Sequence, residues 1–155
     1  MRNNVVKLLV GVGITAIGMF AADSAHGTWK YNAAKSKTNG ANPPKSQTDV
    51  REATPDGGTK LTRTGQLTDG TAINYSFTYK FGGKEYPVTG APFDVVSARR
   101  IDANTMSFEA KKTDGKYHVI GQNVVSKDGK TLTQTGKGTD SQGKPLTSTA
   151  VFDRQ

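Results

Sequence analysis

Hydrophobic and polar residues alternate with a period of two along several stretches of the chain. The clearest case is AINYSFTYKF at 72–81, where Ile, Tyr, Phe, Tyr and Phe alternate with Asn, Ser, Thr and Lys. TMSFEAK at 105–111 alternates in the same way, and PLTSTAVFD at 145–153 permits the same arrangement. Because successive side chains of a strand point to opposite faces of a sheet, these stretches predict strands with one buried and one solvated face.

Turn-forming glycines separate these stretches at regular intervals, and most of them follow Asp. They recur at steps of 13 or 14 residues in two sets, at 57, 70 and 83 and then at 115, 129 and 143. Asp-Gly supplies the left-handed backbone of tight hairpin turns, so the spacing predicts an antiparallel meander. We expect about nine or ten strands, at 28–32, 47–54, 59–66, 71–81, 84–88, 94–101, 105–112, 116–126, 130–137 and 146–153.

The expected architecture is all-β: an antiparallel up-and-down β-barrel of about 8–10 strands, because closing the sheet removes its exposed edges. The stretch 32–46 has no strand pattern and contains Asn42-Pro43-Pro44, so we expect a long loop there. Such a loop is either a binding lid or a mobile connector.

The N-terminus has the features of a cleaved secretory signal helix. Arg2 and Lys7 give it positive charge, and an apolar run follows at 8–22, interrupted by glycines. This run is too short and too rich in Gly for a typical membrane span, although an uncleaved N-terminal anchor is the alternative. We therefore divide the chain into a signal peptide at 1–25 and one barrel domain at 26–155.

The cleavage bond has two candidates. Small residues at Ala22 and Ser24 favour cleavage after Ser24. Cleavage after Ala25 ranks second, because it puts Asp23 where a small residue is preferred.

Composition narrows the chemistry of the domain. The chain has no Cys, which excludes a disulfide scaffold, thiol chemistry and Cys-based zinc sites. Removing Arg2, Lys7 and Asp23 with the leader leaves 19 basic and 12 acidic residues, a net charge of +7. The basic residues are scattered, which is typical of a solvated surface, and we expect no nucleic-acid partner because the aromatic face of 72–81 is needed for the core.

Several candidate inward positions are polar. Arg63, Ser97, Gln134 and Ser148 fall in strands whose other alternating residues are apolar or small. A packed core seldom accepts polar groups without partners, whereas a barrel with a partly wet cavity satisfies them with water or ligand. The alternative is a Thr-rich sandwich or barrel with a filled interior.

VVSARRID at 95–102 contains the most suggestive charged pair. Neighbouring residues of a strand face opposite ways, so either Arg99 or Arg100 should point inward. An inward Arg suits a carboxylate or phosphate group of a ligand. Alternatively, both lie near the strand end, in water or bonded to a rim carboxylate such as Asp102.

The segment GTWK at 27–30, on the first strand of an up-and-down set, resembles the calycin superfamily of lipocalins and fatty-acid-binding proteins. This resemblance implies that Trp29 closes the base of the barrel and that Gly27 allows close backbone approach. It also implies that a basic residue of the last strand, here Arg154, stacks on the indole. GTWKYNAAKSK and VVSKDGKTLTQTGKGTD further resemble lipocalin-like proteins exported by bacteria.

The chain departs from the fatty-acid-binding proteins in two places. Their last strand carries an Arg-x-Tyr pair that grips a ligand carboxylate, whereas the matching positions here are Ala150 and Phe152. The stretch 32–46 also lacks the helical patterning of their two-helix lid. The resemblance therefore implies the shape of the family more than its ligand.

Together these features predict an exported, periplasmic or secreted, monomeric protein that binds a small hydrophobic or amphipathic ligand. We expect no enzymatic activity, cofactor, metal site or membrane span after processing. The alternative is a secreted protein-interaction module such as a protease inhibitor. The expected ligand-binding residues are Tyr75, Phe77, Tyr79, Arg99, Arg100, Phe108 and Phe152, and the expected barrel-closing residues are Gly27, Trp29 and Arg154.

Overall fold

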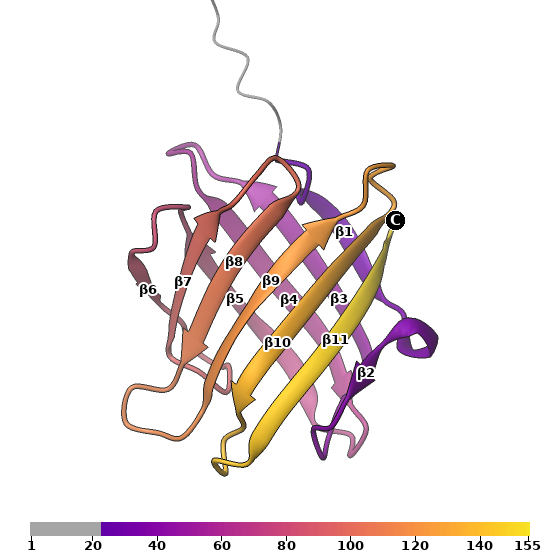
Figure 1. The fold of residues 1–155 in the computed structure, drawn as a ribbon, viewed down its shortest axis with the longest axis vertical. Coiled ribbons are helices and arrows are strands. Elements are labelled where there is room, and N and C mark those ends of the chain that lie inside the picture. The colour runs from indigo at the N-terminus through magenta and orange to yellow at the C-terminus, as the bar shows by residue number, and fades with distance from the viewer. Residues whose placement is uncertain (1–22) are drawn as a thin grey trace, which may run out of the picture.

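A computed structural model describes residues 23–155, which form an antiparallel β-barrel (Figure 1). Its strands are β1 (Gly27–Tyr31), β2 (Lys37–Thr38), β3 (Pro44–Ala53), β4 (Thr59–Leu67), β5 (Ala72–Tyr79), β6 (Glu85–Pro87), β7 (Val95–Arg100), β8 (Thr105–Lys111), β9 (His118–Val125), β10 (Thr131–Thr139) and β11 (Pro145–Arg154). One short 3-10 helix, η1 (Ala33–Lys35), lies between β1 and β2. The expected all-β meander is confirmed.

The strands follow one another around a single sheet in the order β5-β4-β3-β1-β11-β10-β9-β8-β7-β6. The first strand therefore lies beside the last, and Trp29 is in register with Arg154. Among the described residues, no strand ladder joins β5 to β6. There the barrel is closed by side chains and by one isolated parallel bridge between Phe81 and Ala98. The sheet is thus rolled into a nearly closed barrel.

The stretch 32–46 is more regular than expected, and the expectation of a patternless loop is wrong. β2 pairs with the first half of β11, while β1 pairs with its second half. Between them η1 bulges outward, and Asn32 donates its backbone N–H to the Val151 carbonyl oxygen at 2.8 Å. The chain therefore runs along β11 as one interrupted strand, with the last strand as its template, which a local sequence pattern does not reveal.

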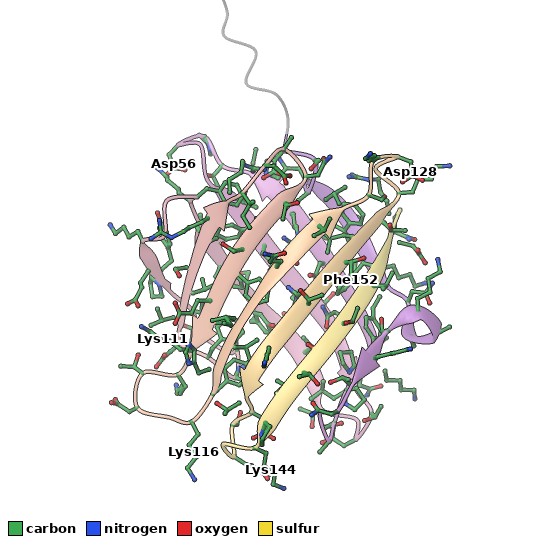
Figure 2. The ribbon with its side chains drawn as sticks, viewed as in Figure 1. Asp56, Lys111, Lys116, Asp128, Lys144 and Phe152 are labelled. Atoms are coloured by element: carbon green, nitrogen blue, oxygen red, sulfur yellow. The ribbon has the colours of Figure 1, made fainter. Side chains whose placement is uncertain are left out.

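A compact apolar cluster fills one end of the barrel, which we call the base. It consists of Ala25, Trp29, Val125, Leu132 and Phe152, and Trp29 is fully buried. The indole Nε1–H donates to the Ala25 carbonyl oxygen at 2.8 Å, so its one polar group is satisfied. Phe152 lies deep between the strands near this end, whereas Lys116 and Lys144 mark the opposite end (Figure 2).

Arg154 covers the base from outside. Its guanidinium carbon lies 4.1 Å from the Trp29 ring centroid, a cation–π contact. The same group donates to the carbonyl oxygens of Gly129, His26 and Ser24 at 2.6, 2.8 and 2.6 Å. The structure thus brings together the residues expected to close the barrel.

Gly27 makes room for this arrangement. A Cβ at this position would lie 2.6 Å from Arg154 Nη1, and the glycine φ of +129° is rarely adopted by other residues.

The contacts of the base begin before His26. The Asp23 carboxylate accepts from the Ala25 backbone N–H at 2.9 Å and pairs with Arg100, and the Ser24 hydroxyl donates to the Ala103 carbonyl oxygen. The expected signal peptide falls almost entirely outside the described residues, and its cleavage remains a prediction. Within 23–155 the structure contains no helix of the length and apolarity that crossing a membrane requires.

Candidate functional site

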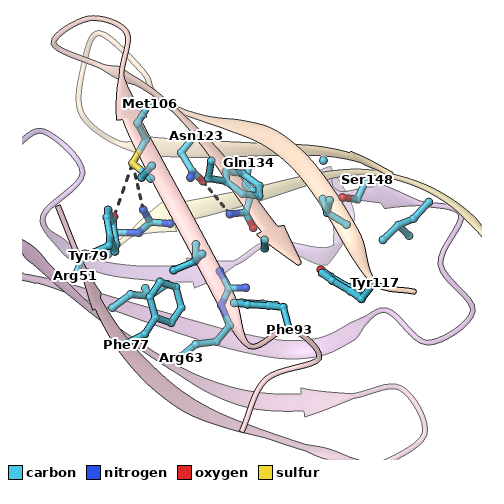
Figure 3. A pocket seen from close by; sticks show the side chains of 18 residues that line it. Arg51, Arg63, Phe77, Tyr79, Phe93, Met106, Tyr117, Asn123, Gln134 and Ser148 are labelled. Atoms are coloured by element: carbon cyan, nitrogen blue, oxygen red, sulfur yellow. Dashed lines mark hydrogen bonds between the residues drawn. The ribbon is translucent and has the colours of Figure 1, made fainter. Parts of the chain in front are cut away.

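A cavity of about 110 Å³ lies inside the barrel, between the base cluster and the opposite end (Figure 3). Its wall is built by inward-facing residues of β3, β4 and β5 on one side and of β7 to β11 on the other. Polar lining residues are Arg51, Arg63, Tyr79, Tyr117, Asn123, Gln134 and Ser148, and the larger apolar ones are Leu61, Phe77, Phe93, Val96, Met106, Phe108, Val119 and Leu146.

Aromatic side chains form one wall of the cavity. The alternation of β5 places Tyr75, Phe77 and Tyr79 on the inner face, and the Phe77 and Phe93 rings meet edge to face at 6.0 Å. Phe93 also stacks on Tyr117 at 5.8 Å, near the end opposite the base. Burial raises the pKa of Tyr117 to about 12, so the phenol is neutral and adds polarity without charge.

A cluster of three charged residues lies against this wall. The register of β3 and β4 sets Asp49 opposite Arg63, and Arg51 follows Asp49 on the same inward face of β3. Arg63 binds the carboxylate with two parallel bonds, from Nε to Oδ1 at 2.8 Å and from Nη2 to Oδ2 at 2.6 Å. Its remaining nitrogen, Nη1, donates to the Tyr75 hydroxyl at 3.2 Å.

The ion pair between Asp49 and Arg63 is fully formed at neutral pH. Burial would raise the pKa of Asp49, but Arg63, Arg51 and a hydrogen bond from Gln47 lower it below its ordinary value of 3.8. Burial would likewise lower the pKa of Arg63, but the facing carboxylate raises it. The cluster therefore contains two guanidinium groups and one carboxylate, which leaves one positive charge.

Arg51 is the poorly partnered member of the cluster. It is 2% exposed, and its Nε has no hydrogen-bond partner. Its Nη2 lies 3.7 Å from Asp49 Oδ2, beyond hydrogen-bond distance, and its Nη1 lies 4.0 Å from the Met106 sulfur. Because Arg63 occupies both carboxylate oxygens, Arg51 keeps donors in the cavity wall that no strong acceptor meets.

The other side of the cavity offers neutral polar groups. Asn123 on β9 and Gln134 on β10 are bonded to each other, with Gln134 Nε2 donating to Asn123 Oδ1 at 3.0 Å. The Gly121 position beside them is narrow, because a Cβ there would approach the Phe108 ring to 2.7 Å. The cavity is therefore apolar and aromatic over most of its surface, with a cationic patch on one side and an amide pair on the other.

The structure divides the expected ligand-binding residues into two groups. Phe77, Tyr79 and Phe108 line the cavity, and Tyr75 lies behind them, bonded to Arg63 and stacked on Phe77. Phe152 does not line the cavity, because it packs beside Trp29 in the base cluster.

Arg99 and Arg100 also lie outside the cavity lining. Arg100 continues the inward row of Val96 and Ala98, but β7 ends there, so its side chain lies at the rim of the base. It pairs with Asp23 rather than Asp102, and its guanidinium carbon lies 4.1 Å from the Phe81 ring centroid. Arg99 is exposed on the outer face. The arginines that line the cavity are Arg51 and Arg63, and only Arg63 was among the polar inward candidates.

The sequence contains a signal for the pairing of Asp49 with Arg63, but none that places the pair on the inner face. The hairpin turn at Asp56-Gly57 fixes the register of β3 and β4, which places Asp49 opposite Arg63. The apolar Val50 suggests the opposite face of β3 as the inner one, but it is only half-buried, whereas Gln47, Asp49 and Arg51 are buried.

Comparisons with known proteins identify the fold. The barrel resembles the crystal structure of the fluorescent protein UnaG, with a TM-score of 0.54 and 12% identity over 85% of this chain and 98% of that one. It also resembles a Schistosoma mansoni fatty acid binding protein in complex with arachidonic acid, with a TM-score of 0.52 and 14% identity over 85% and 96%. No protein-family model and no curated protein matches the sequence. The expected calycin-like barrel fold is confirmed.

Proposed function

We propose that this protein is an exported binding protein that holds a small hydrophobic or amphipathic molecule inside its barrel. The observation that carries the proposal is the cavity itself, an interior space whose lining is mostly apolar and aromatic with a few polar groups. This combination is typical of ligand sites, where apolar area gives affinity and polar groups fix orientation.

The size of the cavity limits the ligand. An apolar cavity of about 150 Å³ is enough to hold benzene, whereas pockets for drug-sized ligands measure about 300–1,000 Å³. At about 110 Å³ the space is smaller than that benzene cavity, so it suits a short chain, and a ring or a longer chain requires side chains of the wall to move.

Structural likeness adds support of a general kind. The Schistosoma mansoni protein of the same fold was solved with arachidonic acid, so a barrel of this shape can hold a lipid. Fold similarity alone does not transfer a function, and the proposal therefore depends on the cavity of this chain. Export to the periplasm or medium, a monomeric state and a binding rather than a catalytic role belong to the same proposal.

Native mass spectrometry tests the proposal directly. The purified protein is incubated with a total lipid and metabolite extract, desalted and analysed for retained small molecules. We expect a retained adduct in the unmodified protein. Its consistent absence would contradict the proposal.

A matched pair of variants assigns the adduct to the cavity. Ser148→Phe projects a ring into the cavity, whereas Thr147→Phe places the same ring on the outer face of the same strand. We expect the adduct to be lost in the first variant and kept in the second. An adduct that survives Ser148→Phe would place binding elsewhere.

A further inference from the structure

The interior of the barrel carries an unbalanced charge. Arg51 and Arg63 are the charged residues that line the cavity, and the single carboxylate beside them, Asp49, is bound at both oxygens by Arg63. An unpaired charge out of bulk water is destabilising, because the low dielectric of the interior does not replace its lost hydration. A negatively charged group beside the surplus positive charge would remove this cost.

The surplus is located at Arg51. Its Nε–H is buried without a partner, its Nη1 meets the Met106 sulfur at 4.0 Å, and Asp49 Oδ2 lies out of hydrogen-bond range of its Nη2. A guanidinium presents its N–H groups in a planar fork that fits the two oxygens of a carboxylate or phosphate. Figure 3 shows Arg51 beside Tyr79 and Met106 at the cavity wall, with its hydrogen-bond contact to the Met106 sulfur drawn as a dashed line.

The surroundings favour an anion with one charge and an apolar body. The Tyr79 hydroxyl donates to the same Met106 sulfur at 3.8 Å, a weak acceptor that a ligand oxygen could replace. Leu61, which is in register with Arg51 on β4, and the residues packed with it, Phe77 and Ala98, give this part of the wall an apolar surface. One negative charge neutralises the cluster, whereas a cation would add to the surplus and a dianion would reverse it.

We infer that the ligand of this barrel is a small amphipathic monoanion, with a carboxylate or an equivalent acidic group bound by Arg51. This inference rests on the proposed function and specifies its ligand class. Arg63 acts as a positioning residue, because it holds Asp49 and so leaves Arg51 free for the ligand. The anchor lies on β3, not on the last strand, where Ala150 and Phe152 offer no charge.

Pairs of ligands that differ only in charge test the inference. Linear monocarboxylic acids of four to ten carbons, and benzoate with short phenylalkanoates, are compared with their primary amides by isothermal titration calorimetry at pH 7. We expect each acid that binds to do so at least about tenfold more tightly than its amide, as charge-assisted hydrogen bonds to a desolvated guanidinium require.

Variants of two arginines assign the preference. Arg51→Met should reduce acid affinity to the level of the amide and leave amide affinity within about twofold, and Arg51→Lys should retain part of the preference. Arg99→Met removes an exposed arginine from the outer face and should change neither. The Nε–H NMR resonance of Arg51 in the unmodified protein gives a second measurement, and it should shift when an acid binds but not when an amide is added.

The possible results separate the inference from the proposed function. Equal binding of acids and amides would overturn the inference and leave ligand binding intact. A preference for acids that survives Arg51→Met, with no shift of the Arg51 resonance, would overturn the assignment to Arg51. Failure of both series, together with no adduct from the extract, would overturn both proposals.

Discussion

Two arginines of this barrel, Arg154 and Arg51, differ in how well their guanidinium groups are partnered. Arg154 at the base donates to three backbone carbonyl oxygens and stacks on the Trp29 ring, so its charge is well partnered. Arg51 in the cavity wall is almost completely buried but has an unpartnered Nε and only distant or weak acceptors. The contacts of Arg154 stabilise the fold, whereas Arg51 keeps N–H donors in the interior that a ligand can bind. The comparison suggests that the base and the cavity wall have different roles.

The strongest test of the comparison is to remove the carboxylate shared by the interior arginines. Asp49→Asn leaves Arg51 and Arg63 without their counter-charge in the barrel, which we expect to lower the free energy of unfolding by about 3–5 kcal/mol. Urea denaturation followed by Trp29 fluorescence measures the loss. A second substitution, Arg51→Met, should restore part of it, because one positive charge is then removed.

A surface carboxylate gives the control for this variant. Asp56 pairs with Lys80 in an exposed turn, and Asp56→Asn should leave the unfolding midpoint almost unchanged.

Because the pKa of Asp49 is lowered in the folded protein, the stabilising effect of this carboxylate is complete above the ordinary value of 3.8 and is lost as the pH falls through the folded-state pKa. Asp49→Asn should therefore weaken the acid dependence of stability, and an unchanged dependence would contradict the assignment.

Breaking the base should have the next largest effect. Arg154→Met removes three charge-assisted hydrogen bonds and the cation–π contact, and we expect a loss of about 2–4 kcal/mol in the free energy of unfolding. Arg99→Met, at an exposed position, is the matched control in the same urea titration. If the two variants were equally stable, Arg154 would not be part of what holds the base together.

In the full-length chain, before any cleavage of the expected signal peptide, the contacts that begin at Asp23 should contribute a smaller amount. Asp23→Ala breaks the ion pair with Arg100 and the hydrogen bond to the Ala25 backbone, for an expected loss of about 1 kcal/mol. Differential scanning calorimetry of this variant, with Glu52→Ala as an exposed control, measures the difference in Tm. No difference between the two variants would show that the base does not need Asp23.

The smallest effect is expected from the arginine with the fewest partners. Arg51→Met replaces a poorly paired buried cation with an apolar side chain of similar length, so the free energy of unfolding should stay the same or rise by about 1 kcal/mol. The measurement is the same urea titration that is used for Arg154→Met. A loss of more than about 2 kcal/mol would mean that Arg51 is a structural residue, like Arg154.

The sequence was informative where one physical constraint controlled a whole segment. In β5 aromatic and polar residues alternate strictly, so only the aromatic face of the strand can be buried. Phe77 and Tyr79 could therefore be assigned to the interior. At the base, the resemblance to the calycin superfamily that the GTWK motif carries implied the contact of Trp29 with Arg154, which the structure contains. The first case depends on a local pattern, and the second on a family likeness.

The charged cluster could not be predicted in the same way. β3 buries Gln47, Asp49 and Arg51, which a hydrophobicity pattern assigns to the solvent, and only pairing across the hairpin to Arg63 makes their burial tolerable. Arg100 shows the opposite problem. One arginine of the pair Arg99 and Arg100 was expected to face inward, and Arg100 has that parity, but the end of β7 places it at the rim, and strand ends are the least predictable feature of a sequence.

The side-chain junction between β5 and β6 has a mechanical consequence. Elsewhere the wall is a continuous ladder of directional backbone bonds, whereas here Phe77, Tyr79, Phe81 and Tyr86 pack across the join without such a ladder. Ring contacts lack the fixed spacing of a hydrogen-bonded ladder, so we expect this line to be the place where the wall yields first when a guest larger than the cavity enters.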